Sequence, residues 1–182
     1  YPQFLYEVQA ELLKTYHNVK PDILYRTDDL WDYSKYNTTI VSKSSGAILK
    51  PYYTMVKSDE EDKIGLLQIY TPSSKQNMIS YLVGTTEGEN NKLKLYKFSE
   101  DSNILGTMQL DKQIEQDETI SAEIQALNKT GTKVTKDMVV VPIENTLLYV
   151  ESIYQTMLNE SKVPALRKIV VASGNKVAIG NN

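Results

Sequence analysis

Ser173 and Lys176 have the S-x-x-K spacing by which a lysine amine can activate a serine hydroxyl in acyl-transferring enzymes. That chemistry requires the pair at the start of a helix. Here the two residues between them are Gly174 and Asn175, a combination typical of a tight turn, and apolar runs lie on both sides. The spacing therefore predicts a hairpin between two strands and no acyl transfer.

Glu151 is the carboxylate with the most unusual surroundings, because it ends the apolar run Leu147-Leu148-Tyr149-Val150-Glu151. The alternation of a strand does not decide which face it occupies. An exposed strand face is the favoured interpretation. A buried Glu151 would need a partner for its charge and would become a candidate acid or base.

Several kinds of site are excluded by residue content. The chain has no cysteine and one histidine, His17, which rules out thiol nucleophiles, iron–sulfur clusters and zinc fingers. His17 is interpreted as a surface or helix-capping residue. Gly131-Thr132-Lys133 does not form a phosphate loop, because Thr132 stands where that motif requires glycine. We therefore expect no catalytic residue, no metal site and no cofactor.

The charge of the chain argues against nucleic acid as a partner. The net charge is -3, and only two of the 20 basic residues are arginine, the side chain best suited to clamp phosphates and read guanine. The apolar runs, such as residues 138–143, are far shorter than the roughly 20 residues that a membrane span needs. We expect no direct insertion of this segment into a bilayer.

Three segments have the apolar spacing of amphipathic helices. The first begins near Pro2 and is expected to lie on the domain; its apolar stripe consists of Phe4, Leu5, Val8, Leu12, Leu13 and Tyr16. The second follows the S-x-x-Q pair Ser73 and Gln76 and ends at Gly84. The third is capped by Asp117.

Strands are predicted over most of the remaining chain, at residues 51–57, 63–70, 92–98, 105–110, 133–143, 147–155, 167–172 and 176–179. The acidic link 58–62 is interpreted as a hairpin loop, because a calcium loop would need spaced ligands and a glycine. Strands joined by such short links must be antiparallel. The sequence thus predicts an α+β fold, mainly antiparallel sheet with two to four amphipathic helices packed on it, as a single soluble domain over residues 1–182.

The chain also resembles uncharacterised protein family 0182, a family of bacterial multi-pass integral membrane proteins. The resemblance is carried by Tyr1-Pro2 with Leu5-Tyr6-Glu7-Val8-Gln9, Asp29-Leu30-Trp31, Tyr52-Tyr53, Tyr70-Thr71-Pro72 with Asn77-Met78-Ile79, Gln116-Asp117, Val141-Pro142-Ile143, Leu147-Leu148-Tyr149-Val150-Glu151 and Val170-Val171-Ala172 with Lys176-Val177-Ala178. It implies a fragment excised from the C-terminal part of a large extracytoplasmic region. The family has no established catalytic residues to carry over.

The expected function is a non-catalytic binding or interaction domain on the extracytoplasmic side of the cell membrane. Its expected partner is the remainder of its own membrane protein, or another envelope protein. The alternative is part of a cell-envelope hydrolase that uses carboxylate acid/base chemistry. A deep pocket with converging carboxylates of raised pKa would favour the hydrolase, and a flat apolar patch would favour the binding domain.

Four residues are the candidates for binding: Glu151, Tyr149, Tyr70 and Asn77. All four lie in the stretches that resemble the family. The chain has 13 tyrosines against two phenylalanines. Tyrosine combines a large apolar ring with a polar tip and therefore suits both sheet faces and recognition surfaces.

Overall fold

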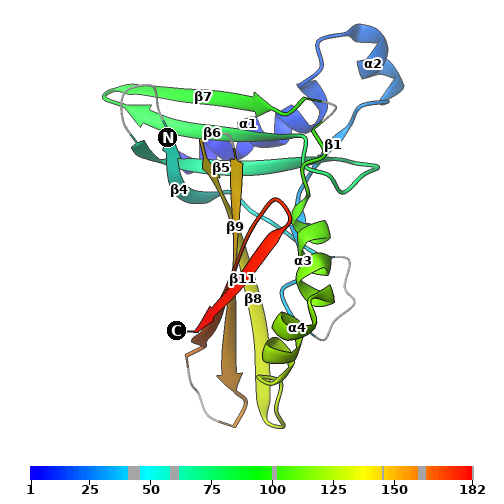
Figure 1. Cartoon of the computed structure of the whole chain (residues 1–182). Helices are drawn as coiled ribbons and strands as arrows, with labels where there is room; N and C mark the ends of the chain where they lie inside the picture. Colours follow the sequence, from blue (N-terminus) through cyan, green and yellow to red (C-terminus); the bar gives the residue numbers. More distant parts are fainter. Residues whose placement is uncertain (41–45, 58–61, 100–101, 145, 160–162, 182) are drawn as a thin grey trace. The chain divides into compact units, whose positions relative to one another are not determined.

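The computed structural model describes residues 1–40, 46–57, 62–99, 102–144, 146–159 and 163–181. The chain forms two compact units, each built from two segments, and Figure 1 labels their helices and strands. Unit 1 comprises Tyr1–Ser34 and Ile48–Gly106, and unit 2 comprises Lys35–Ala47 and Thr107–Asn182. A compact unit need not fold independently, so the single domain expected from the sequence stays a prediction.

The predicted fold class is confirmed: the described chain contains four helices and mainly antiparallel sheet. Unit 1 contains α1 (Gln3–Tyr16), α2 (Pro21–Arg26), β1 (Trp31–Tyr33), β4 (Tyr52–Lys57), β5 (Asp62–Pro72), β6 (Ser80–Glu87) and β7 (Asn90–Lys97). Unit 2 contains α3 (Thr107–Gln116), α4 (Glu118–Gln125), β8 (Thr132–Ile143), β9 (Thr146–Met157), β10 (Ala165–Ser173) and β11 (Lys176–Asn181). Two short strands, β2 (Lys35–Tyr36) and β3 (Ala47–Ile48), pair with each other.

In unit 1, α1 packs on a five-stranded sheet in which β5 pairs with β1, β4 and β6, and β6 pairs with β7. Two buried tyrosines join the helix to the sheet. The Tyr6 hydroxyl donates to the Leu82 carbonyl at 2.8 Å, and the Tyr70 hydroxyl donates to the Ala10 carbonyl at 2.9 Å. Burial of such rings is favourable here because each polar tip has a partner. The β4–β5 pairing confirms the predicted hairpin, whose loop 58–61 lies outside the described residues.

The helix predicted after Ser73 is wrong, because residues 80–87 form strand β6. Gly84, expected to end that helix, lies in the middle of the strand and pairs with Leu66 and Leu93. A Cβ at this position would lie 2.6 Å from the Tyr6 ring, so only glycine lets α1 approach the sheet this closely. Tertiary packing therefore overrides the local helical spacing.

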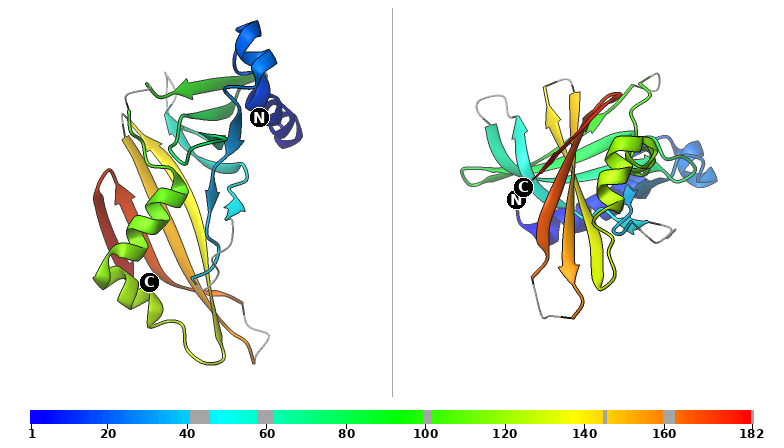
Figure 2. Two further views of the ribbon diagram at one scale, coloured as in Figure 1. Left: turned by 90° about the vertical axis from the view of Figure 1, so that its right-hand side faces the viewer. Right: turned by 60° about the horizontal axis from the view of Figure 1, so that its bottom comes forward.

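Unit 2 is a four-stranded antiparallel sheet in the order β11-β10-β9-β8. Helices α3 and α4 lie against one of its faces (Figure 2). Along β8 and β9 every second residue is buried, as expected for strands with one covered face. The Asp117 cap is confirmed, because its side chain accepts a hydrogen bond from the Ile120 amide at 2.9 Å. The strand predicted at 105–110 is wrong, since α3 begins at Thr107.

The two edges of this sheet differ. The β8 edge is covered near Thr135 and Lys136, which pair with Thr39 and Thr38, and Pro142 removes a backbone donor further along the same strand. The β11 edge carries no further strand among the described residues. Across the part of the chain that the structure describes, no helix is long and apolar enough to cross a membrane.

Candidate functional site

An exposed apolar surface in unit 1 lies on α1. We call it the α1 stripe; it consists of Phe4, Leu5, Val8, Leu12 and Tyr16, whose exposed fractions range from 43 to 75%. The helix packs on its unit as expected, but five of the six residues of the predicted apolar stripe are exposed. The inward face of α1 is formed instead by Tyr6 and Ala10, with Leu13 half-buried beside them. The helix therefore has two apolar sides, of which only one packs on its own sheet.

In unit 2, a buried charge cluster lies between α3 and the sheet; it consists of Asp111, Lys136 and Glu151. Asp111 belongs to the inward face of α3, where Leu110 and Ile114 are also buried. Lys136 on β8 and Glu151 on β9 lie on the covered face of the sheet. Since Glu151 pairs with Met138, it is diagonal to Lys136 across the two strands. The register thus brings three charges together inside the unit.

Lys136 is the hub of this cluster. Its Nζ donates a short hydrogen bond to Asp111 Oδ1 and lies 3.4 Å from Glu151 Oε1. The half-exposed Glu115, one helical turn beyond Asp111, approaches the same Nζ at 3.9 Å. The side chains of Asp111, Lys136 and Glu151 are all almost fully removed from solvent. Such burial is tolerated because the charges are paired.

The cluster has one negative charge in excess when both carboxyl groups are ionised, and its electrostatics reflect this. Burial is the largest effect on Glu151 and raises its pKa; the nearby Lys136 acts to lower it and the negative charge of Asp111 to raise it, and together they give a pKa of about 7. Burial also acts to lower the pKa of Lys136, but Glu151 and Asp111 outweigh it and hold the ammonium charged. A hydrogen bond to Asp111 also acts to raise the pKa of Glu151.

The pattern of hydrogen bonds agrees with proton uptake. Asp111 Oδ2 and both side-chain oxygens of Glu151 are buried without a hydrogen-bond donor among the described residues. A proton between the two carboxyl groups would supply one. Chemically, the cluster can therefore hold and release a proton near neutral pH.

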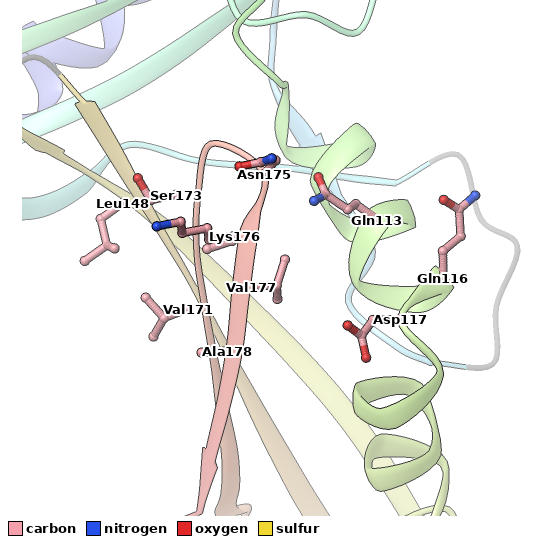
Figure 3. A pocket seen from close by; sticks show the side chains of 11 residues that line it. Gln113, Gln116, Asp117, Leu148, Val171, Ser173, Asn175, Lys176, Val177 and Ala178 are labelled. Atoms are coloured by element: carbon pink, nitrogen blue, oxygen red, sulfur yellow. The ribbon is translucent and has the colours of Figure 1, made fainter.

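An open groove of about 790 Å³ lies elsewhere in unit 2, beside the β10–β11 hairpin. Gln113 and Asp117 point from the helices toward β11, and Val177 points from β11 toward the helices (Figure 3). Ser173 and Lys176 also line it and close the two-residue hairpin turn, as predicted. None of the three cluster residues is among the residues that line this groove.

The four predicted binding residues do not converge on one site. Tyr149 and Glu151 lie in unit 2 as neighbours on the covered face of β9, and both are buried. The prediction that Glu151 lies on an exposed strand face is therefore wrong. Tyr70 and Asn77 belong to unit 1. Tyr70 is a core residue, and Asn77 donates a short hydrogen bond to the Asn103 side chain.

Sequence reasoning missed Asp111 and Lys136, the partners of Glu151. A signal for each was present. Lys136 stands between Val134 and Met138 at the spacing of one strand face, and Asp111 falls within the apolar spacing of Leu110 and Ile114. A charged residue at an inward position predicts a buried counter-charge, although it does not say which one.

His17 confirms its expected role as a cap, since it is the C-terminal cap of α1 and its ring contacts the Leu13 carbonyl at 2.9 Å. The ring stacks on Trp31 at a centroid distance of 3.6 Å and pairs with Asp29 at 3.1 Å. Trp31 is buried in the core of unit 1. Over the residues that the structure describes, no group of three or more histidine, aspartate or glutamate side chains is arranged to hold a metal ion.

The fold and these surfaces define an α+β polypeptide with an exposed apolar helix and a sealed charge cluster. The family model described as Uncharacterised protein family (UPF0182) matches residues 1–127, and the chain belongs to this family. No solved structure matches the chain.

Relatives come from several bacteria. A UPF0182 protein of Caldicellulosiruptor saccharolyticus is 33% identical over 100% of this chain and 20% of its own length. Those of Trichodesmium erythraeum and Microcystis aeruginosa are 36% and 37% identical over 98% of this chain, which covers 18% and 19% of their lengths. The chain thus spans about a fifth of the length of these curated relatives.

Proposed function

We propose that this chain is a non-catalytic interaction domain on the extracytoplasmic side of a longer bacterial membrane protein, and that the α1 stripe docks on another part of that same protein. The observation that carries the proposal is the exposure of five large apolar side chains along one side of α1. Contiguous apolar surface of this kind marks interaction sites.

The choice of partner follows from length. The relatives are about five times as long as this chain, so most of such a protein is available to cover the stripe. Fully burying a Leu or Phe side chain contributes about 1.5–3 kcal/mol, and each stripe residue retains roughly half of its surface for a partner. Together they can contribute several kcal/mol to docking.

The hydrolase alternative has one observation in its favour, the raised pKa of Glu151 beside Asp111. A general acid or base must come within hydrogen-bond reach of its substrate. Glu151 and Asp111 are almost fully buried, and the groove in the same unit is lined by other residues. The two carboxyl groups therefore lie close together, but a substrate cannot reach them as hydrolysis requires.

The docking proposal can be tested by cross-linking in the full-length protein in its own membrane. A photoreactive phenylalanine analogue is placed at Leu12 in the α1 stripe, with Glu7 on the exposed polar side of α1 as the matched control. We expect Leu12 to cross-link to a peptide outside this chain and Glu7 not to do so. Equal cross-linking at both positions would refute the stripe as an interface, and cross-links to a separate protein would refute the choice of partner.

The location can be tested separately, because this chain contains no cysteine. A single cysteine replaces Val19, which is 92% exposed, in a full-length protein otherwise free of cysteine. A membrane-impermeant maleimide should label it in intact cells. Labelling only after the membrane has been permeabilised would place the domain on the cytoplasmic side instead.

A further inference from the structure

We infer that the open edge of β11 is a docking site for a polypeptide segment in extended conformation, which binds as a fifth strand beside β11. The site lies in unit 2 and does not depend on the α1 stripe. Two observations support the inference: the hydrogen-bonding capacity of the strand edge and the groove beside it.

The register of the β10–β11 hairpin decides which backbone groups face outward. Its turn contains two residues, Gly174 and Asn175, and Ser173 pairs with Lys176 at the turn. The closing pair of such a hairpin exchanges both of its backbone hydrogen bonds, and the pattern then alternates along the strands. The amides and carbonyls of Val177, Ile179 and Asn181 therefore point away from β10, toward the open edge.

These groups are accessible. The residues of β11 are exposed or half-buried, and no described strand pairs with the outer side of β11. Proteins usually protect such an edge with proline, a bulge or a covering segment. The opposite edge of the same sheet has two of these protections, Pro142 and the pairing of Thr38 and Thr39, which leaves β11 as the edge that can accept a strand.

The groove supplies the space for side chains of the incoming strand. Gln113 and Asp117 form its helix side, and Val177 contributes an apolar surface from β11 (Figure 3). The groove is lined by two charged side chains: Asp117, which caps α4 through the Ile120 amide, on the helix side, and the exposed Lys176 at the turn end of β11. Backbone pairing of this type supplies affinity, and the pockets for alternate side chains supply specificity.

The chemistry of the expected segment follows from these neighbours. It is extended and free of proline at the pairing positions, because each outward-facing residue of β11 can exchange two backbone hydrogen bonds. It carries β-branched or other apolar side chains beside Val177 and Ile179, and an acidic side chain beside Lys176.

The experiment uses the whole 182-residue chain with a tethered test strand. A Gly/Ser linker of about 12 residues and a strand of alternating valine and threonine that ends in one glutamate are added after residue 182, so that antiparallel pairing brings the glutamate beside Lys176; the tether gives the strand an effective concentration in the millimolar range. The control strand replaces the threonines with proline. Amide hydrogen exchange is then measured by NMR.

We expect the amides of Val177, Ile179 and Asn181 to exchange at least tenfold more slowly with the test strand than with the proline control. The variant Ile179→Pro removes one outward-facing donor without removing a bond to β10, and it should abolish this protection in its neighbours. Lys176→Glu should weaken it, and a lysine in place of the glutamate of the strand should restore it.

Two results would overturn the inference. One is unchanged exchange at the three edge amides with the test strand attached. The other is equal protection by the proline control, since contacts that do not use the backbone would then be responsible. The amides of Ile169 and Val171 on β10, which face β11 in the same alternation, report whether the hairpin of each variant is still folded.

Discussion

Replacing Glu151 with glutamine tests the assignment of the buried charge cluster directly. Glutamine has the same shape as glutamate but cannot ionise. It leaves Asp111 and Lys136 as a neutral pair, with a side-chain amide that can donate toward Asp111 Oδ2, which lacks a donor in the wild-type chain. The variant therefore removes the excess negative charge without opening a cavity.

The expected magnitude follows from the pKa of Glu151, which burial raises to about 7 from an ordinary value of 4.5. The folded protein thus binds this proton more tightly than the unfolded chain does, so the wild-type free energy of unfolding falls as the pH rises from about 4.5 through about 7. At about 1.36 kcal/mol for each pH unit, the loss is about 3 kcal/mol. Glu151→Gln lacks this loss, because its side chain is neutral at every pH.

Urea unfolding of both proteins at a series of pH values measures this effect. Relative to the wild type, the variant should gain about 3 kcal/mol in the free energy of unfolding between pH 4 and pH 8. Glu115→Gln is the matched control, because the Glu115 side chain is 53% exposed and lies at the rim of the cluster. A pH profile of Glu151→Gln parallel to that of the wild type would refute the account of a proton held by Glu151.

Two further predictions concern the packing of each unit. Lys136→Met should lower the free energy of unfolding by about 3–5 kcal/mol at neutral pH, because it leaves two buried carboxyl groups without their cation; the loss should shrink in urea titrations at pH 5, where Glu151, whose pKa is raised to about 7, is protonated. Gly84→Ala should cost about 1–3 kcal/mol by thermal or urea unfolding, because the added Cβ would lie 2.6 Å from the Tyr6 ring. The control Gly180→Ala meets no atom within 4 Å and should change stability by less than about 0.5 kcal/mol; equal effects of the two substitutions would contradict the packing argument.

The strands of unit 2 could be predicted because their signals are local. Alternating apolar residues and the Gly174-Asn175 turn appear directly in the sequence, and the structure has the hairpin there. The error at β6 has a different origin. The spacing of Met78, Ile79 and Leu82 fits a helix. Glycine is required at position 84, however, because the Tyr6 ring, far away in the sequence, packs against this point of the strand. No local pattern contains that information.

The cluster could be predicted only in part, for a related reason. The sequence identifies Glu151 as a carboxylate in an apolar run, and the structure makes it a member of a buried cluster. Its partner Lys136 lies diagonally across from it on β8. That position depends on the register between β8 and β9, which in turn depends on how the two strands are joined. Asp111 comes from a helix that the sequence assigned in part to a strand. Charge pairing across elements depends on both assignments being right.

The α1 stripe shows why an apolar pattern can be read correctly and still be assigned to the wrong contact. Spacing of one, three and four residues establishes that Val8 and Leu12 share a side of a helix, but it does not establish what covers that side. On α1 the contact with the sheet uses Tyr6 and Ala10. An apolar side as extensive as the stripe is costly to leave in water, and the length of the relatives provides a polypeptide that can cover it. Apart from Leu13, the residues of the predicted stripe are therefore proposed as the surface that docks on the rest of the protein.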